Sequence, residues 1–564
     1  MPVHKTDLNR REFLTRALQS AAAVIAGGAG AGALLPGCEL VRHGGRNVLR
    51  IALAEDITTL DPAFAVRALD GFVICNIHEN LTWHNRQVQL VPRLALSWET
   101  RDNSNSWIFH LRKGVLFHDG SAFNADSVKF HFDRLKDPTT RSNRSTKMKD
   151  VDHIDVLDEH TVQFYMAKPF SLWPVRVRDG FGAIVSPSAV KAANGDREAE
   201  YQRAKALDPK AVRPEPNGFQ YSRKPSGTGP FMFVEQEPDQ FLRMRRNPNY
   251  WDADRIKVDE VEFRPIREPT TRLIVLEQGG VDVADVLYSH VEVAERHKDI
   301  KLERSPLLCF SYIVLNCMKP PLSDIRVRHA ANHAIDRDAL VRYAFRGNAD
   351  PAYGVLPPSL PAADPELKSV YPFDLDKART LMKQAGIENG VDLEMWSKDD
   401  AGDTGLGVVL ADQLQRIGFR ITIKRFDRNV YWGRFDPYQT IDGKWYPTKK
   451  GVFDMAVSRW VGGEHPFGFL DPLFRSTSSS NMCFYRNLEV DRLLDESLKI
   501  SEEAAQHDLY RRIQRQIVDD APCIFTYYPR THWGVRTRVE GMHVHPAGEY
   551  EFQGVTLAGV DGLA

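Results

Sequence analysis

The stretch from Ser458 to Pro466 contains four side chains that suit recognition of a small charged molecule. The guanidinium of Arg459 has the fork that holds a carboxylate or phosphate, although a surface ion pair would use it equally well. Trp460 can stack on a ligand or pack in the core at a strand end. Glu464 offers the carboxylate that a buried ammonium group requires. His465 could ligate a metal, but a lone histidine is more often a hydrogen-bonded structural residue.

Two aromatic residues elsewhere are candidates of the same kind. Trp396 follows a predicted strand, and Tyr312 lies within another. Ligands of parallel α/β sheets bind beyond the carboxyl ends of the strands. We therefore expect the segments that begin at Trp396 and at Arg425 to lie near a ligand, and we add Tyr312 as a candidate.

No motif for catalysis or cofactor binding occurs in the sequence. There is no GxSxG, HExxH, P-loop or dinucleotide fingerprint, and the glycines at Gly227 and Gly229 are not followed by GK[ST]. No CxxC pair occurs, so a structural zinc site is not expected. The sequence therefore predicts a protein that is not an enzyme and holds no cofactor or metal, with an exported hydrolase as a distant alternative.

The elements that position these residues can be predicted locally. Residues 107–111 alternate as a strand, 115–118 form a second short run, and Asp119-Gly120 is typical of a tight turn. Asn124 stands where a helix N-cap belongs, and Val128, Phe132 and Leu135 follow on one apolar face. The expected order is strand, turn, strand, turn and capped helix.

A βαβ unit is predicted further along the chain. Asp374 caps a helix that Gly386 ends, residues 391–395 alternate as a strand, and residues 406–417 form a helix that Gly418 ends. Residues 419–423 form the return strand. Two strands joined by a helix through short connections predict a parallel pair in an α/β sheet.

Several phrases of the sequence resemble one family. LRKGVLFHDGSAFNADSV, from Leu111, is similar to the signature of the family 5 extracellular solute-binding proteins, the dipeptide, oligopeptide and nickel-type receptors of ABC importers. LVPRLALSWE precedes it as in that family. The phrases GTGP, NPNYWD and DIRVRHAANHAIDRDALV follow in the family order.

The resemblance implies an α/β fold like that of the periplasmic binding proteins, of the class II, oligopeptide-receptor-like type. Two lobes would be joined by a hinge, with a small extra α+β domain. We expect residues 48–85, 224–300 and 525–564 in the first lobe, residues 86–223 in the small inserted domain and residues 301–524 in the second lobe. A segment from about 193 to 223, polar and interrupted by two prolines, reads as a surface loop or short helices.

The resemblance also implies a function and a site. Such proteins capture a solute between the lobes and deliver it to a membrane permease. In peptide-binding members, an Asp three residues after the tryptophan accepts the ligand's ammonium group; here that position is Gly463, and Glu464 follows it. Phe64, after the Thr59–Pro62 turn, would face the ligand or belong to the core. We expect a peptide or peptide-like solute, with a non-peptide solute (an opine, sugar or metal chelate) as the alternative.

The N-terminus resembles an export signal. Asn9 to Leu14 reads NRREFL, as in twin-arginine signals, and Leu35 to Cys38 resembles a lipobox, which makes Cys38 the lipidated residue. The intervening Ala/Gly run is too weakly apolar for a membrane anchor. We expect residues 1–38 to be the signal, and the protein to lie in the periplasm or on the outer face of the cytoplasmic membrane, anchored by lipid only.

Charge and composition restrict the partners. The 564 residues carry 74 basic and 75 acidic side chains, a formal net charge of -1, and hydrophobic residues make up 42%. No basic excess indicates nucleic-acid binding, and the apolar fraction suffices for packed cores. We expect a monomer whose partners are the ligand and the permease. Five cysteines remain besides Cys38, and the sequence does not assign their pairing.

Overall fold

The computed structural model describes residues 47–209, 219–399, 401–434, 438–441, 444–447 and 453–558. Asn47–Ala564 forms one compact unit. The predicted signal at residues 1–38, including Cys38, lies outside the described residues. No helix of the described part is long and apolar enough to cross a membrane.

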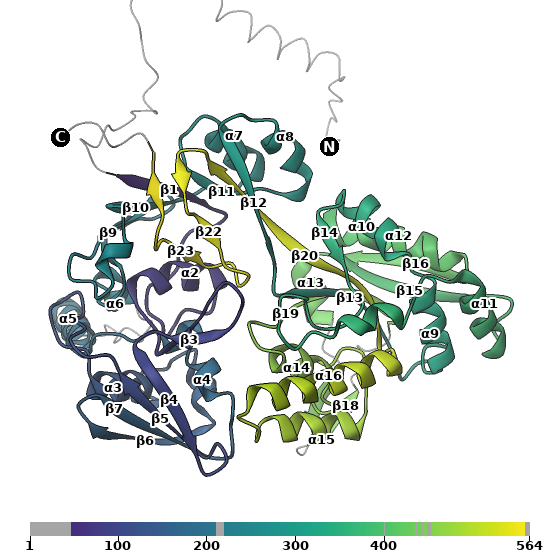
Figure 1. Ribbon diagram of the computed structural model, residues 1–564, viewed down its shortest axis with the longest axis horizontal. Coiled ribbons are helices and arrows are strands. Elements are labelled where there is room, and N and C mark those ends of the chain that lie inside the picture. Colours follow the sequence, from purple (N-terminus) through teal and green to yellow (C-terminus); the bar gives the residue numbers. More distant parts are fainter. Residues whose placement is uncertain are drawn as a thin grey trace, which may run out of the picture. The chain divides into compact units, whose positions relative to one another are not determined.

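The fold is organised around one long strand, β20 (Cys523–Arg536), which belongs to two halves of a single sheet (Figure 1). Its first part pairs with β13 (Cys309–Leu315) and β14 (Ala349–Pro351). Its second part pairs with β11 (Val283–Asp285) and β12 (Ile300–Pro306). Each half carries its own helices and core, so the described chain has two lobes that share β20.

The first lobe contains the strand order β11-β1-β10-β9-β8. The apolar run near the start of the described chain forms β1, which pairs in parallel with β10. The other pairs of this lobe, β10 with β9 and β9 with β8, are antiparallel. The elements of this lobe are β1 (Val48–Leu53), α2 (Ala68–Ile77), β8 (Phe231–Glu237), β9 (Phe241–Arg246), β10 (Glu260–Pro265), α7 (Pro269–Glu277) and α8 (Val291–Glu295).

The second lobe confirms the predicted βαβ unit. β15 (Val391–Lys398) pairs in parallel with β16 (Phe419–Phe426), and α12 (Ala401–Gln415) connects them. Asp374 caps α11 as predicted, accepting the N–H of Lys377 at 2.8 Å. The sheet order is β16-β15-β19-β13-β20. The other elements are α9 (Ile325–His333), α10 (Arg337–Phe345), α11 (Leu375–Gln384), α13 (Arg428–Arg434), β19 (Met455–Val461), α14 (Phe467–Phe474), α15 (Leu488–Ser497) and α16 (Glu503–Asp520).

A separate four-stranded antiparallel sheet, at the lower left of Figure 1, contains the strand that the sequence predicts at residues 107–111. Its order is β4 (Ala95–Arg101), β5 (Ser106–Leu111), β7 (Thr161–Met166) and β6 (Val151–Asp158). α3 (Ala125–Lys136) packs on it through Phe132, whose ring meets Phe164 edge-on at 5.1 Å. Asn124 caps α3 by accepting the N–H of Ser127 at 3.0 Å, as predicted.

Two local predictions differ from the structure. Residues 115–118 form no named strand; one bridge joins Leu116 to Ala122, because the tight turn leaves too few residues for a ladder. The segment after residue 193 belongs to a long helix, α5 (Pro187–Leu207). Ser186 caps α5 and Pro187 occupies its first turn, where the missing N–H costs nothing. The two prolines that suggested a loop lie beyond its end.

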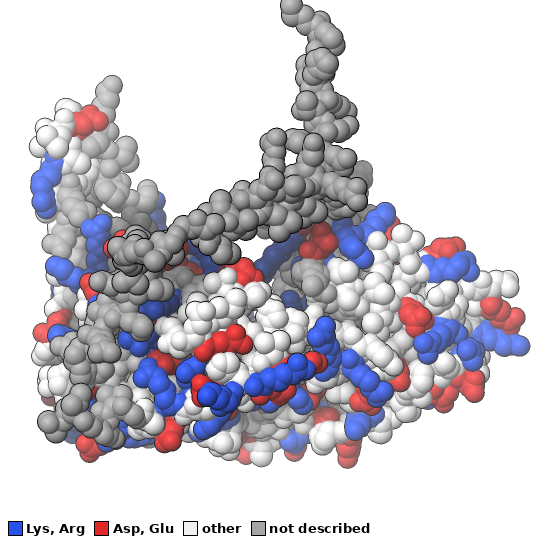
Figure 2. Space-filling view, turned by 90° about the horizontal axis from the view of Figure 1, so that it is seen from above, with Lys and Arg blue, Asp and Glu red and all other residues white. Residues whose placement is uncertain are grey.

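Short elements complete the described chain. The C-terminal segment forms two small ladders, in which β21 (Val539–Glu540) pairs with β24 (Thr556–Leu557) and β22 (His543–Val544) pairs with β23 (Tyr550–Glu551). The rest are β2 (Thr82–His84), β3 (Leu90–Pro92), α4 (Trp173–Arg176), α6 (Phe219–Arg223), β17 (Tyr438–Ile441) and β18 (Lys444–Pro447). On the face shown in Figure 2, acidic and basic side chains are interspersed, in keeping with the balanced composition.

Candidate functional site

A cavity of about 360 Å³ lies where β20 passes from one lobe to the other. First-lobe residues from β1, α2 and the segment after β11 line one side, and second-lobe residues from α10, α12 and β19 line another. Its volume is within the range of small-molecule sites. The lining includes Ala54, Phe72, Tyr288, Phe345, Gly402, Arg459, Tyr527, His532, Trp533 and Tyr550.

Three charged side chains line this cavity. Asp285 is paired with Arg272, whose Nε lies 2.6 Å from Oδ1. Arg530 donates to Asp350, with its Nε 2.8 Å from Oδ2. Arg459 lies near the end of β19 with an exposed side chain, so it presents a positive charge to the cavity. The predicted carboxylate-binding residue is therefore in a position to meet a ligand, and its binding role stays a prediction.

Three residues that line the cavity each carry a buried polar atom without a hydrogen-bond partner among the described residues. These atoms are Nε2 of His532, Nε1 of Trp533 and the hydroxyl of Tyr550. They have almost no accessible surface, so the lining of the cavity does not expose them to a ligand. Burial, followed by the charges of Arg304 and Arg530, lowers the pKa of His532 to about 4, so its ring is neutral at pH 7.

A glycine pair directs Glu464 away from β19. A Cβ on Gly462 would approach the Phe469 ring to 2.2 Å, so only glycine fits against that ring. Gly463 has φ +74°, the left-handed region that glycine enters without steric cost. The chain therefore turns sharply, and Glu464 becomes buried among residues of other segments.

Glu464 belongs to a buried charge cluster, here defined as Glu464, Arg178, Glu549, His84 and His545. Nη2 of Arg178 lies 2.5 Å from Oε1 of Glu464, and the same nitrogen contacts Glu549. The two histidines approach Glu464 through Nδ1, at 3.6 Å and 3.8 Å. The described lining of the cavity includes no member of the cluster, and the two are connected only along the chain, because Tyr550 lines the cavity and Glu549 precedes it.

The two carboxylates of the charge cluster share one guanidinium. Burial alone raises the pKa of Glu464, but Arg178 and then His84 outweigh it, and the pKa falls to about 2. Burial raises the pKa of Glu549 to about 7 against the pull of Arg178, and the charge of Glu464 adds to the rise. At neutral pH the Glu464 carboxylate therefore stays ionised, whereas Glu549 readily takes a proton.

The same cluster contains the one group of possible metal ligands found among the described residues. Ligand atoms of Glu464, His545 and Glu549 lie within 4.8 Å of one another. Arg178 already contacts both carboxylates, and Nδ1 of His545 accepts the N–H of Ala547 at 3.1 Å. Arg178 therefore already occupies the carboxylate oxygens that a metal ion would need, so these contacts speak against a metal ion.

The neighbours of Glu464 and Arg459 have structural contacts. His465 is half-buried, its Nε2 lies 3.2 Å from Oε1 of Gln506, and desolvation lowers its pKa to about 3. Trp460 is half-buried and donates from Nε1 to the carbonyl of Gly468 at 2.8 Å. Both residues therefore hold the turn around Glu464, and any contact of theirs with a ligand stays a prediction.

Tyr312 and Trp396 lie together in the apolar core of the second lobe. The Tyr312 ring stacks on Phe310 at 4.7 Å, and Trp396 packs against Phe453 at 5.4 Å. Neither lines the cavity at β20. The sequence placed both on the correct strands, but the period-two pattern alone does not tell the ligand side of a strand from its core side.

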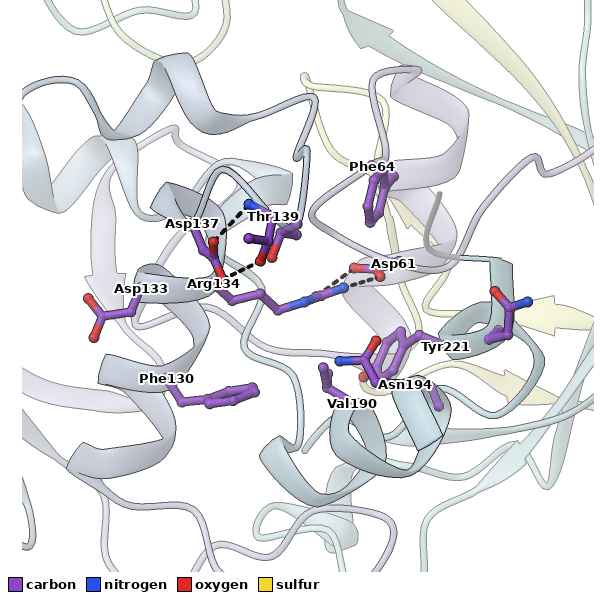
Figure 3. A pocket seen from close by; sticks show the side chains of 13 residues that line it. Asp61, Phe64, Phe130, Asp133, Arg134, Asp137, Thr139, Val190, Asn194 and Tyr221 are labelled. Atoms are coloured by element: carbon purple, nitrogen blue, oxygen red, sulfur yellow. Dashed lines mark hydrogen bonds and ion pairs between the residues drawn. The ribbon is translucent and has the colours of Figure 1, made fainter. Parts of the chain in front are cut away.

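Phe64 lines a different cavity, of about 390 Å³, between α3, α5 and α6 (Figure 3). Arg134 crosses this cavity and holds the buried Asp61 through two hydrogen bonds, of 3.0 Å and 2.5 Å. Asp137 likewise accepts the N–H of Thr139 at 2.8 Å. These polar groups therefore have hydrogen-bond partners within the protein and do not require a ligand.

Sequence reasoning missed most of the charge cluster. Arg178 and Glu549 are separated by 371 positions, and neither lies in a recognisable motif. The surrounding contacts explain their positions: Asn80 holds the carbonyl of Arg178 at 2.9 Å, and the guanidinium lies over the Trp83 ring at 4.4 Å. No local pattern would have brought these residues together.

Two lobes that share a strand, with a largely apolar cavity between them, are the arrangement of a solute receptor. Residues 89–481 match the model of bacterial extracellular solute-binding proteins, family 5. The chain belongs to this family and is the extracytoplasmic substrate-binding component of an ABC importer.

The chain is also similar to individual members along most of its length. It is 29% identical over 516 residues to the glutathione-binding protein GsiB of Pectobacterium atrosepticum, covering 90% of this chain and 93% of that protein. The GsiB of Escherichia coli K12 is 28% identical, with 90% and 94% covered. The Helicobacter pylori binding protein DppA, solved with the peptide STSA, superposes with a TM-score of 0.68 at 25% identity, covering 91% and 99%.

Proposed function

We propose that the protein captures a short peptide or peptide-like solute in the cavity at β20 and delivers it to a membrane permease. The ligand's ammonium group would lie at Glu464 and Glu549, and a ligand carboxylate would pair with Arg459. Glu464 would thus replace the aspartate that Gly463 lacks.

The observation that carries this proposal is the unequal charge of the cluster. Two buried carboxylates face one guanidinium, and Glu549 relieves the imbalance by taking a proton near neutral pH. An ammonium group is the ligand feature that could replace this proton, because it brings both a positive charge and hydrogen-bond donors.

The relatives support the same ligand class. The names of the similar proteins specify glutathione, and the solved complexes include a protein bound to Met-Leu and another bound to a nonapeptide. Solved structures of the same fold also include proteins with agropinic acid or Ni(L-His). Gly463, in the place of the usual acid, favours a solute without an amine as the second candidate.

Export and anchoring complete the proposal. The NRREFL motif and the segment ending at Cys38 support folding before export by the twin-arginine route, followed by a lipid anchor on a monomeric protein. Residues 86–223 would form the inserted domain, with the two lobes bounded as the sequence predicts. No catalytic step is proposed, and recovery of the bound solute unchanged after long incubation is the matching test.

Thermal unfolding of the chain from Glu39 onward tests the ligand class. The panel contains di- to pentapeptides, glutathione, opines, sugars and metal chelates. A ligand at 100 times its Kd adds about 2.7 kcal/mol to the stability of the folded protein, which is readily measured as a higher midpoint. A shift with peptides supports the proposal, and a shift only with amine-free solutes favours the second candidate.

Glu464→Ala then tests the proposed ammonium site by calorimetric titration. We expect the affinity for a peptide to fall at least about tenfold, whereas the N-acetylated peptide, which has no ammonium, should bind both proteins equally weakly. Glu388→Ala, at an exposed pair with Lys383, is the matched control. Unchanged affinity in Glu464→Ala would place the ammonium elsewhere.

A further inference from the structure

Three cysteines from separate parts of the chain meet in the second lobe. Cys317 follows β13, Cys483 lies between α14 and α15, and Cys523 begins β20. Cys483 and Cys523 belong to the buried apolar core, and Cys317 packs against it. None of the three lines the cavity at β20 or belongs to the charge cluster, so solute binding leaves their grouping unexplained.

The contacts among these residues are close. The N–H of Cys317 donates to the carbonyl of Cys483 at 3.0 Å, and its sulfur lies 3.9 Å from the carbonyl of Pro522. Burial, and after it the proximity of Cys483, raises the pKa of both Cys523 and Cys317. Cys483 is therefore close to both of the other cysteines.

The other two thiols of the mature chain have different surroundings. Cys75 lies on α2 and its sulfur contacts the carbonyl of Phe72 at 3.2 Å. Cys309 is buried at the start of β13, opposite Val461. No contact joins either of them to another cysteine among the described residues. Cys75 and Cys309 therefore serve as control thiols within the same chain.

We propose that Cys317, Cys483 and Cys523 form a thiol–disulfide site that takes up one disulfide, with Cys483 as a partner in the bond. The co-reactant is a small disulfide such as oxidised glutathione. Two cysteine thiols lose two protons and two electrons as the S–S bond forms. The small disulfide gains both and leaves as two thiols, so the exchange balances.

Accessibility and acidity set the order of events. Cys317 is half-buried while the other two are buried, so exchange begins at Cys317 and passes to Cys483. Burial raises the pKa of Cys317 to about 12, which keeps the thiolate scarce at neutral pH. The exchange is therefore slow at pH 7 and becomes faster as the pH rises.

The proposed export route gives the site a physiological setting. Twin-arginine export moves a folded protein, so these thiols would pack together in a reducing cytoplasm and meet an oxidising compartment afterwards. The bond would then tie the loop before α15 to the core of the second lobe. This setting rests on the proposed export, whereas the chemistry can be tested on the purified protein alone.

The test is oxidation of the native protein from Glu39 onward by oxidised glutathione at pH 8.5. Mass spectrometry after alkylation in denaturant should show two of five thiols lost and no glutathione retained. Peptide mapping should place Cys483 in the bond, and the unfolding midpoint should rise. Cys483→Ser should lose the disulfide, whereas Cys75→Ser and Cys309→Ser should retain it.

The outcomes decide the proposal separately from solute binding. Five free thiols after prolonged oxidation, or a bond that excludes Cys483, would overturn it. Each variant is first checked by its reduced unfolding midpoint, and Cys483→Ala provides a second variant if Cys483→Ser does not fold. Because the readout is thiol count and not ligand affinity, failure of the ligand proposal leaves this result unaffected.

Discussion

Replacing Glu549 by glutamine should change how the stability of the folded protein depends on pH. In the wild-type protein, burial raises the pKa of Glu549 to about 7 from an ordinary 4.5. Below about pH 4.5 this carboxyl is protonated in both the folded and unfolded states, so it does not lower the free energy of unfolding. Above pH 7 it is ionised in both, and the folded state carries the cost of burying the second charge beside Glu464.

The magnitude follows from the difference between these pKa values. At 1.36 kcal/mol per pH unit, the cost of the buried charge reaches about 3 kcal/mol above pH 7. Glutamine has the shape of the protonated acid and takes no charge. We therefore expect Glu549→Gln to be about as stable as the wild type at pH 5, and up to about 3 kcal/mol more stable at pH 8.

Urea unfolding of both proteins between pH 5 and pH 8 measures this difference directly, because the other titrating groups are common to both. Glu388→Gln, at an exposed ion pair with Lys383, should show no comparable change since such pairs contribute little. A Glu549→Gln protein that is less stable than the wild type at pH 8, or a difference that stays constant with pH, would refute the reasoning.

Three further predictions concern single residues. Asn124→Ala removes the hydrogen bond that the side chain accepts from the N–H of Ser127, and it should lower the free energy of unfolding in urea by about 1 kcal/mol. An unchanged free energy of unfolding would show that this cap does not stabilise α3. Arg459→Gln should weaken binding of peptides with a free C-terminus at least about tenfold and leave amidated peptides unaffected, by calorimetric titration; equal losses for both would contradict a carboxylate partner. Cys38→Ala should move the protein from the membrane to the soluble fraction on cell fractionation, and retention on the membrane would exclude the lipid anchor.

The sequence predicted those parts of the fold that depend on local patterns. The parallel pair β15–β16 followed from two alternating strands and a helix between two glycines. The cap at Asn124 followed from one side chain and the apolar face after it. The end of α5 was missed because prolines just beyond a helix and prolines within a loop look alike in a sequence.

The candidate site was less accessible to sequence reasoning. Arg459 was found from the chemistry of its guanidinium, and Glu464 from its place next to the ammonium-binding position that the family resemblance implies. Arg178 and Glu549 were missed because their importance comes from one shared guanidinium contact across 371 positions. Burial, which makes the charge of Glu549 costly, is a property of the folded chain and is absent from its local sequence.

The position of β20 has a consequence for how the protein is made. Both halves of the large sheet receive β20, which follows every other strand of that sheet along the chain. A chain growing on the ribosome therefore cannot complete the sheet of either lobe before β20 has emerged. The strand pairs that join the two lobes thus form late in synthesis, because they connect residues far apart in the sequence.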